Sequence, residues 1–262
     1  MTEVHHFAYG MINPALAYVM SFLGSLLGLV FTARSRESSG GSRARWLIMA
    51  AVSIGSTGIW LMHFMAMLGF DVPASVVRYD VGITALSLGI AVVIVGLGLF
   101  TVGFGRASGP KIVFGGTFTG VGVAAMHYTG MAAVRVNGQI TYDPGRVGLS
   151  VLIAVVAAIV ALWFAVVIRG ASATVSAALI MAVAVCSMHY TAMSAVRIEL
   201  HEPHGPVQGT SPAVLLVPIF VLASVVISTL AYSTVGISIH RETARAEARL
   251  AYRRRVFVGA RS

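Results

Sequence analysis

Seven apolar runs of about 20 residues divide this sequence, and they restrict the chain to folds that cross a membrane several times. The runs cover residues 12–33, 46–70, 81–104, 112–134, 147–168, 173–196 and 213–237. A helix of this length spans the roughly 30 Å hydrocarbon core of a bilayer. Hydrophobic residues make up 57% of the chain and charged residues only 10%, far from the composition of a soluble domain. We therefore predict an all-α, polytopic integral membrane protein with seven transmembrane helices.

The Lys and Arg residues predict the orientation. Fourteen of the 18 fall in alternate loops and in the C-terminal tail, and four fall in the other loops: Arg78, Arg135, Arg146 and Arg197. Cytoplasmic loops retain cations, so we predict the N-terminus outside and the C-terminus inside. This divides the chain into an outer segment (1–11), a membrane domain (12–237) and a basic cytoplasmic tail (238–262). The same bias explains most of the net charge of +9, so we expect a lipid bilayer and no nucleic acid as partner.

A methionine–histidine motif occurs three times. It reads MHFMAM at 62–67, MHYTGM at 126–131 and MHYTAM at 188–193. The histidines are 64 and 62 residues apart, which fits two spans and two loops, so we predict three two-helix repeats plus a seventh helix. Each histidine lies eight residues before a charged outer flank, or roughly 12 Å along a helix. We therefore expect His63, His127 and His189 in one layer near the outer face.

The residue types in the motif favour a soft or borderline metal. Residues four apart share a helix face, so His63 stacks on Met67, His127 on Met131 and His189 on Met193. Neutral imidazole and thioether ligands suit copper and add no charge of their own to the membrane interior. Haem with paired axial histidines is an alternative, whereas zinc would more often show Cys or a carboxylate. Another alternative is that these side chains only pack and hydrogen-bond the helices.

Other features narrow the function. Carboxylates are placed at loops rather than beside the histidines: Asp71, Asp80, Asp143, Glu199 and Glu202. Metal-dependent hydrolysis normally uses a nearby carboxylate, so we expect no enzyme. The third, fifth and seventh spans have almost no polar residue at mid-membrane, which disfavours a transporter. Cys186, three residues before His189, is either a small packing residue or an extra sulfur ligand. The pairs Gly24/Gly28 and Gly116/Gly120 predict close helix approach.

Because of these three motifs, the sequence resembles the MHYT family of bacterial integral-membrane sensor domains, over roughly residues 10 to 237. The resemblance implies a multi-pass protein of the bacterial plasma (inner) membrane that binds copper and through it detects O2, CO or NO. The ligands that it implies are His63, His127, His189, Met62, Met67, Met126, Met131, Met188 and Met193. Residues placed to support the ligands by hydrogen bonds are Tyr128, Thr129, Tyr190 and Thr191.

Members of that family often continue into a diguanylate cyclase, a phosphodiesterase, a kinase or a DNA-binding output domain. Only about 25 residues follow the last predicted span, so we expect a stand-alone sensor. Its signal would pass to a separate cytoplasmic partner, or through a homodimer, by way of residues 238–262. The alternative function is a protein that acquires, stores or delivers copper without sensing a gas.

Overall fold

The computed structural model describes residues 8–73, 75–200, 206–229 and 232 of the 262-residue chain. Its contacts divide the chain into two units, residues 1–223 and 224–262, and each is described by itself. The predicted tail 238–262 and residues 1–7 of the predicted outer segment lie outside the described residues. The last predicted span, 213–237, is described to residue 229 and at 232.

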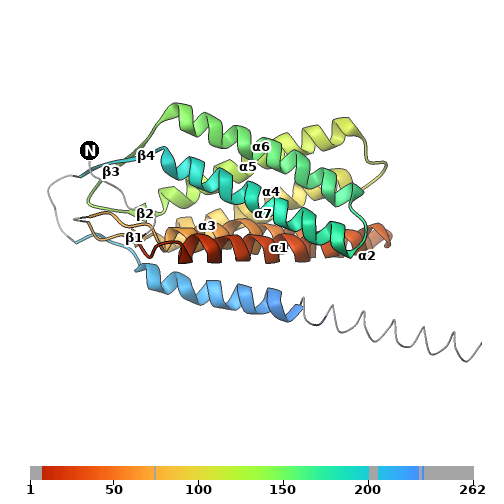
Figure 1. Cartoon of the computed structure of the whole chain (residues 1–262), viewed down its shortest axis with the longest axis horizontal. Coiled ribbons are helices and arrows are strands. Elements are labelled where there is room, and N and C mark those ends of the chain that lie inside the picture. Colours follow the sequence, from red (N-terminus) through yellow and green to blue (C-terminus); the bar gives the residue numbers. More distant parts are fainter. Residues whose placement is uncertain (1–7, 74, 201–205, 230–231, 233–262) are drawn as a thin grey trace, which may run out of the picture. The chain divides into compact units, whose positions relative to one another are not determined.

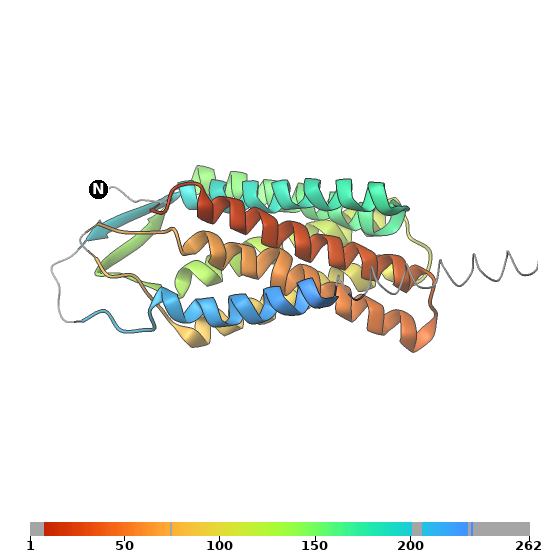
Figure 2. The ribbon, with the colours of Figure 1, turned by 60° about the horizontal axis from the view of Figure 1, so that its bottom comes forward.

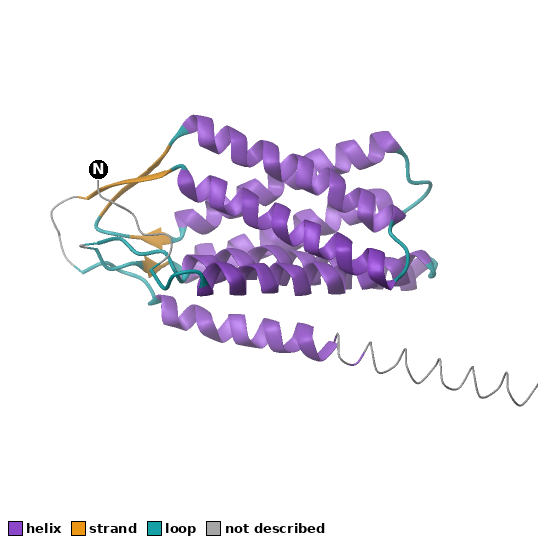
Figure 3. Cartoon of the chain, in the orientation of Figure 1, coloured by secondary structure: helices purple, strands orange, loops and turns teal. Residues whose placement is uncertain are grey.

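Helices account for most of the first unit (Figures 1 and 3). They are α1 (Ile12–Arg36), α2 (Gly40–Val52), η1 (Ser53–Leu61), α3 (Met62–Met67), α4 (Val81–Gly103), α5 (Gly109–Ala132), α6 (Pro144–Val167), α7 (Ala171–Ser194) and η2 (Pro212–Leu215). Three of these, α2, η1 and α3, are consecutive stretches of one helix, Gly40–Met67. Residues 216–229 are also helical and continue from η2.

Six described helices are long and apolar enough to cross a membrane. They are Ile12–Arg36, Gly40–Met67, Val81–Gly103, Pro144–Val167, Ala171–Ser194 and Pro212–Thr229. The remaining predicted span, 112–134, does form a helix, α5, but its glycines and polar residues dilute its hydropathy and it is not among the six. The multi-pass helical class is thus confirmed, whereas the count of seven spans and the orientation stay predictions.

The helices of the first unit close into a bundle. Consecutive pairs pack together from α4 to α7, and α1 packs both on α7 and on the helix Gly40–Met67. Figure 2 shows α1 between these two neighbours. Large apolar side chains such as Leu86, Phe114, Leu152 and Trp163 remain exposed on the outside of the bundle. That arrangement suits a protein whose surroundings are hydrocarbon rather than water.

Glycine sets how closely two pairs of helices approach. A Cβ on Gly24 of α1 would lie 2.3 Å from the backbone nitrogen of Gly58 in η1. A Cβ on Gly120 of α5 would lie 2.4 Å from the Cα of Val155 in α6. One turn away from these glycines, a Cβ on Gly116 would lie 2.6 Å from the Cα of Ile159, and a Cβ on Gly28 would meet the side chain of Ile54. The close approach expected at both small-residue pairs is therefore confirmed.

Four short strands correct the all-α prediction. They are β1 (Arg78–Tyr79), β2 (Val134–Arg135), β3 (Gly138–Tyr142) and β4 (Val196–Leu200). β1 pairs antiparallel with β2 and β3 with β4, in two separate sheets at one end of the bundle (Figure 3). The prediction treated these segments as helix flanks and loops. They form strands because each can pair its backbone with a segment that follows the neighbouring motif helix.

The same two contacts, a helix N-cap and an ion pair, occur twice at the end of the bundle that carries the strands. Asp80 and Asp143 are the N-caps of α4 and α6, and each accepts a hydrogen bond from the backbone N–H three residues on, at 3.0 and 3.1 Å. Arg135 lies 3.2 Å from Asp80, and Arg197 lies 2.8 Å from Asp143. Each arginine lies three residues after the end of a motif helix, α5 or α7, so each ion pair links the start of α4 or α6 to the end of that motif helix.

Acid should remove the contribution of these two carboxylates to stability. The capping backbone N–H groups, and after them the paired arginines, hold the pKa of Asp80 and of Asp143 below the usual range. A lowered pKa stabilises the folded state above about pH 4, and this stability is lost as the pH falls further. The double variant Asp80→Asn/Asp143→Asn should unfold at a lower temperature than the wild type near pH 7. The gap should close toward pH 3 in thermal unfolding of detergent-purified protein, and a gap of equal size at both pH values would contradict the assignment.

Candidate metal centre

The three histidines occupy equivalent places near the ends of three helices. His63 lies four residues before the end of α3, and His127 and His189 lie five residues before the ends of α5 and α7. The strands that follow hold these helix ends level, since Tyr79 pairs with Val134 and Tyr142 with Val196. The common depth expected from the eight-residue spacing is therefore what the structure shows.

The three imidazoles form one compact cluster inside the bundle. One ring nitrogen from each histidine lies within 4.8 Å of the other two. The Nδ1 atoms of His63 and His189 are 3.1 Å apart, a hydrogen-bond distance. The ring centroids are separated by 4.8 Å (His63 to His127), 5.1 Å (His63 to His189) and 5.2 Å (His127 to His189). All three side chains are at most 1% exposed.

Two of the histidines carry ring nitrogens without a hydrogen-bond partner among the described residues. These are Nδ1 and Nε2 of His127, and Nε2 of His63. A neutral imidazole has one N–H and one lone pair, and each is costly to leave unpaired away from water. Such atoms are rare in buried positions and call for an explanation, for example an ion bound by the lone pairs.

The backbone leaves room for this cluster at Gly130. A Cβ at this position of α5 would lie 2.6 Å from Nε2 of His63, too close for any other residue type without a shift. Gly130 follows the tetrapeptide MHYT directly, whereas the third copy has Ala192 at the equivalent position. The sequence prediction missed this role of Gly130, although the glycine in MHYTGM was a visible signal.

A π-helical stretch leads into His63 and was also missed. η1 comprises nine residues directly before Met62, and such turns are uncommon and frequently lie at functional sites. Its wider turn brings Gly55 against α4, where a Cβ would lie 2.8 Å from the Cα of Val92. The first repeat therefore reaches the cluster by a different helical path from the other two.

All six motif methionines are buried inside the bundle. They are Met62, Met67, Met126, Met131, Met188 and Met193, none more than 3% exposed. Each lies within four residues of a clustered histidine. The cluster that the structure brings together comprises the three histidines; within the described residues, neither Cys186 nor any carboxylate joins it. The cluster therefore offers imidazole nitrogens, with buried thioethers close to them in the chain, and these ligand types suit copper.

Of the four residues predicted to support the ligands, Tyr128 and Tyr190 place their rings edge-on against clustered histidines. The hydroxyl of Ser150 on α6 donates to the carbonyl of Val147, so its oxygen accepts the hydrogen bond from the Tyr128 hydroxyl, at 2.9 Å. Tyr128 thereby ties α5 to α6, and its ring contacts those of His127 and Tyr142. Thr129, Tyr190 and Thr191 are partly exposed, and the ring of Tyr190 lies edge-on to His189.

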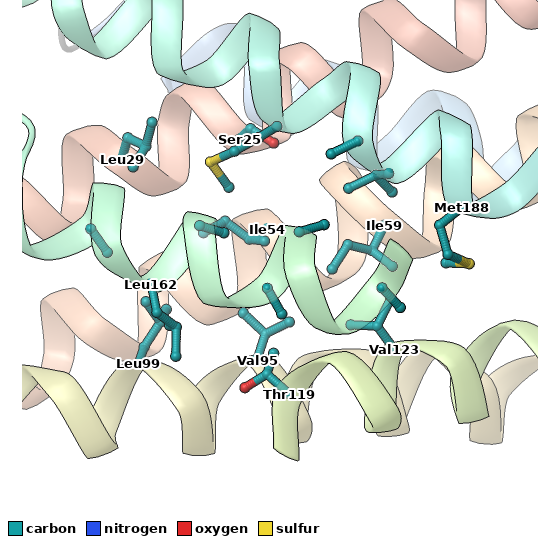
Figure 4. A pocket seen from close by; sticks show the side chains of 18 residues that line it. Ser25, Leu29, Ile54, Ile59, Val95, Leu99, Thr119, Val123, Leu162 and Met188 are labelled. Atoms are coloured by element: carbon teal, nitrogen blue, oxygen red, sulfur yellow. The ribbon is translucent and has the colours of Figure 1, made fainter. Parts of the chain in front are cut away.

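An apolar cavity of about 60 Å³ begins beside the third motif. Met188, the residue before His189, lies at one end of it, as Figure 4 shows. Its lining comes from five helices of the bundle and from η1, and among these residues only Ser25 and Thr119 are polar. Water finds few partners in such a space, so the cavity suits a small uncharged molecule.

Comparison with known proteins relates the repeats to a family. The chain matches MHYT, described as "Bacterial signalling protein N terminal repeat", three times, at residues 57–116, 120–178 and 183–252. Each match begins six or seven residues before one of the clustered histidines. The third match extends into residues outside those described. No solved structure matches the chain.

Curated relatives are bacterial signalling proteins. The chain is 38% identical to the bifunctional diguanylate cyclase/cyclic di-GMP phosphodiesterase MucR of Pseudomonas aeruginosa, over 74% of this chain and 29% of MucR. It is 37% identical to the cyclic di-GMP phosphodiesterase NbdA of the same organism, over 70% of this chain and 24% of NbdA. An uncharacterized signaling protein of Caulobacter vibrioides is 34% identical over 63% of this chain and 20% of that protein. The chain thus spans less than a third of the length of these relatives. With three matching repeats, each supplying one histidine to a buried cluster, it belongs to the MHYT family of bacterial signalling proteins.

Proposed function

We propose that this protein is a membrane sensor that holds copper in the histidine cluster and responds to a diatomic gas (O2, CO or NO) or to copper itself. The observation that carries the proposal is the convergence of one buried imidazole from each repeat, with ring nitrogens within 4.8 Å and both nitrogens of His127 unpartnered among the described residues. Helix packing alone does not account for the buried imidazole of His127, whose two ring nitrogens have no hydrogen-bond partner among the described residues.

The residues of the three motifs would have two different roles in binding copper. His63, His127 and His189 would supply the nitrogen ligands, and the six motif methionines would supply soft thioethers around them. These residues would hold the ion through neutral ligands, and copper bound in this way would supply the affinity for a diatomic gas. The burial of the cluster keeps bulk water away from it. We propose no enzymatic reaction for the chain, because no carboxylate of the described residues joins the histidines, and Asp80 and Asp143 are helix caps paired with arginine.

The apolar cavity supports the gas response. It lies inside the bundle and reaches Met188, so an apolar gas dissolved in the membrane would find space next to the third motif. Its four partly exposed lining residues all belong to α6 or α7: Ala157, Ala161, Ala184 and Val185. Because three of these are alanines, the gap between α6 and α7 is the entry that we propose from the lipid side.

The signalling relatives support the output side of the proposal. MucR and NbdA share the region that contains the three motifs, and their names assign cyclic di-GMP chemistry to those proteins as wholes. For this chain we propose that a signal reaches a separate partner, or a second copy, through residues 238–262. The proposed location is the bacterial plasma (inner) membrane, with the histidine layer toward the outer face.

Metal content after copper loading tests the proposal. Detergent-purified wild type should retain about one copper per chain, because three clustered nitrogens can serve a single ion. The triple variant His63→Ala/His127→Ala/His189→Ala should retain almost none, while His5→Ala/His6→Ala, altered outside the motifs, should match the wild type. Size-exclusion profiles would check that each variant is folded. Equal, near-zero copper in wild type and triple variant would refute the proposal.

Carbon monoxide separates a gas sensor from a copper carrier. Wild type loaded with Cu(I) should show an infrared band of bound CO that is missing in the triple variant. Copper retention without a CO band, together with rapid transfer of copper to an added chelator, would instead favour acquisition, storage or delivery of copper.

A further inference from the structure

A second cavity lies at the opposite end of the bundle from the histidines. Its volume is about 250 Å³, and residues from α1, α2, α4, α6 and the loop before α5 line it. Three arginines line it together: Arg36 at the end of α1, Arg43 near the start of α2, and Arg169 just after α6. The histidine cluster lies near the ends of α3, α5 and α7, beside the strands, so the two sites are distinct.

The hydrogen bonds leave several of these arginine donors available. Arg36 donates from its terminal nitrogens to the carbonyls of Ala165 and Ile168, which ties α1 to the end of α6. Its Nε is buried and has no partner among the described residues. Arg43 donates from Nε to the carbonyls of Ser35 and Ser38, and its two terminal nitrogens make no hydrogen bond within the described part of the chain.

The wall of the cavity carries arginines and no carboxylate. The hydroxyls of Thr32 and Ser35 on its wall donate to carbonyls of their own helix, so they offer no proton to the cavity. No Asp or Glu lines the cavity. The two ion pairs found among the described residues both lie at the other end of the bundle, beside the strands. Glu37, next to Arg36, is exposed and does not line the cavity.

A fourth cation lies near the rim. A Cβ on Gly105, a lining residue, would lie 3.5 Å from Nζ of Lys111. Three guanidinium groups and an ammonium group therefore gather around a polar cavity with no carboxylate on its wall. Like charges held this close repel one another, and an anion between them would relieve that repulsion.

We propose that this cavity is a binding site for a phosphate group, carried either by an anionic phospholipid or by a soluble phosphate compound. Guanidinium groups bind phosphate oxygens through paired, charge-assisted hydrogen bonds. The three arginines approach from three different segments, and a tetrahedral phosphate offers acceptors in several directions, unlike a planar carboxylate. The proposal is independent of copper, since no residue of the cavity belongs to the three motifs.

Binding of defined phosphate probes tests the site. One arm measures thermal stabilisation of the protein in a neutral detergent by inorganic phosphate and pyrophosphate. The other counts phosphatidylglycerol molecules that stay bound in native mass spectrometry, with phosphatidylcholine as the neutral comparison. Arg43→Gln/Arg169→Gln is the test variant, and it spares Arg36 because that side chain ties α1 to α6. Arg45→Gln/Arg106→Gln is the matched control, because it removes the same charge from the same end and neither residue is among those that line the cavity.

The wild type should bind at least one of the two probe classes. The test variant should bind it about tenfold more weakly or worse, and the control should stay within about twofold of the wild type. Stabilisation by free phosphate would identify a soluble ligand, and retention of phosphatidylglycerol alone would identify a lipid headgroup. The proposal is overturned if neither probe binds, or if both double variants lose binding equally, because the latter would reflect overall charge.

Discussion

Replacing His127 by leucine is expected to lower copper affinity by more than about 100-fold while leaving the metal-free protein as stable as the wild type. A change that only disturbs the support of a ligand costs about 10- to 100-fold in affinity, and loss of a ligand should exceed that range. Neither ring nitrogen of His127 has a partner among the described residues, so leucine, of similar volume, removes no hydrogen bond. Copper titration and thermal unfolding without copper would measure the two effects.

His63→Leu is the matched comparison, because it should weaken copper binding and also destabilise the metal-free protein. His63 Nδ1 lies 3.1 Å from His189 Nδ1, and its removal deprives His189 of this partner. Loss of one partner in a buried hydrogen bond costs about 1–3 kcal/mol. If both leucine variants lost the same stability and neither changed copper affinity, the cluster would be a helix-packing device.

Gly120→Val is expected to prevent correct packing of the bundle, with a loss of about 3 kcal/mol or more in the free energy of unfolding. The new Cβ would lie 2.4 Å from Cα and 2.6 Å from the backbone nitrogen of Val155, and 2.7 Å from the carbonyl oxygen of Ala154. These are backbone atoms, so α5 and α6 would have to separate. The measurements are the yield of monodisperse protein and its unfolding temperature in detergent.

Gly148→Val is the control for this change. It introduces the same side chain on α6, where a Cβ at Gly148 meets nothing within 4 Å. Its effect should stay below about 1 kcal/mol, the scale of helix propensity. Equal loss of stability in both variants would mean that valine disturbs these helices through propensity and not through the distance between them.

The features that repeat in the sequence were the ones that could be predicted. The spacing of His63, His127 and His189 gave the common depth of three helix ends, because rise per residue and helix direction fix depth. The same reasoning predicted close approach at Gly24 and Gly120, since small residues four apart form one smooth helix face. Both predictions rest on local geometry that needs no knowledge of the partner helix.

The features that were missed depend on partners far away in the chain. β3 forms only because β4, more than 50 residues later, supplies the backbone groups that it needs. The π-helical stretch Ser53–Leu61 packs on α1 and α4, and these partners are not visible in its own residues. The cavity with Arg36, Arg43 and Arg169 also escaped prediction, because the loop cations were attributed to membrane orientation and to contact with lipid.

The two sheets connect the middle repeat, residues 120–178, to both of the other repeats. β2 pairs backward with the first repeat and β3 pairs forward with the third, and only Val136 and Asn137 separate the two strands. A displacement of α5 along its axis would therefore pull on both neighbours at once, whereas α3 and α7 are each tied to one. Three copies are the smallest tandem array with such an internal member. Duplication of an ancestral two-helix unit would have had to proceed beyond a pair before this mechanical linkage could exist.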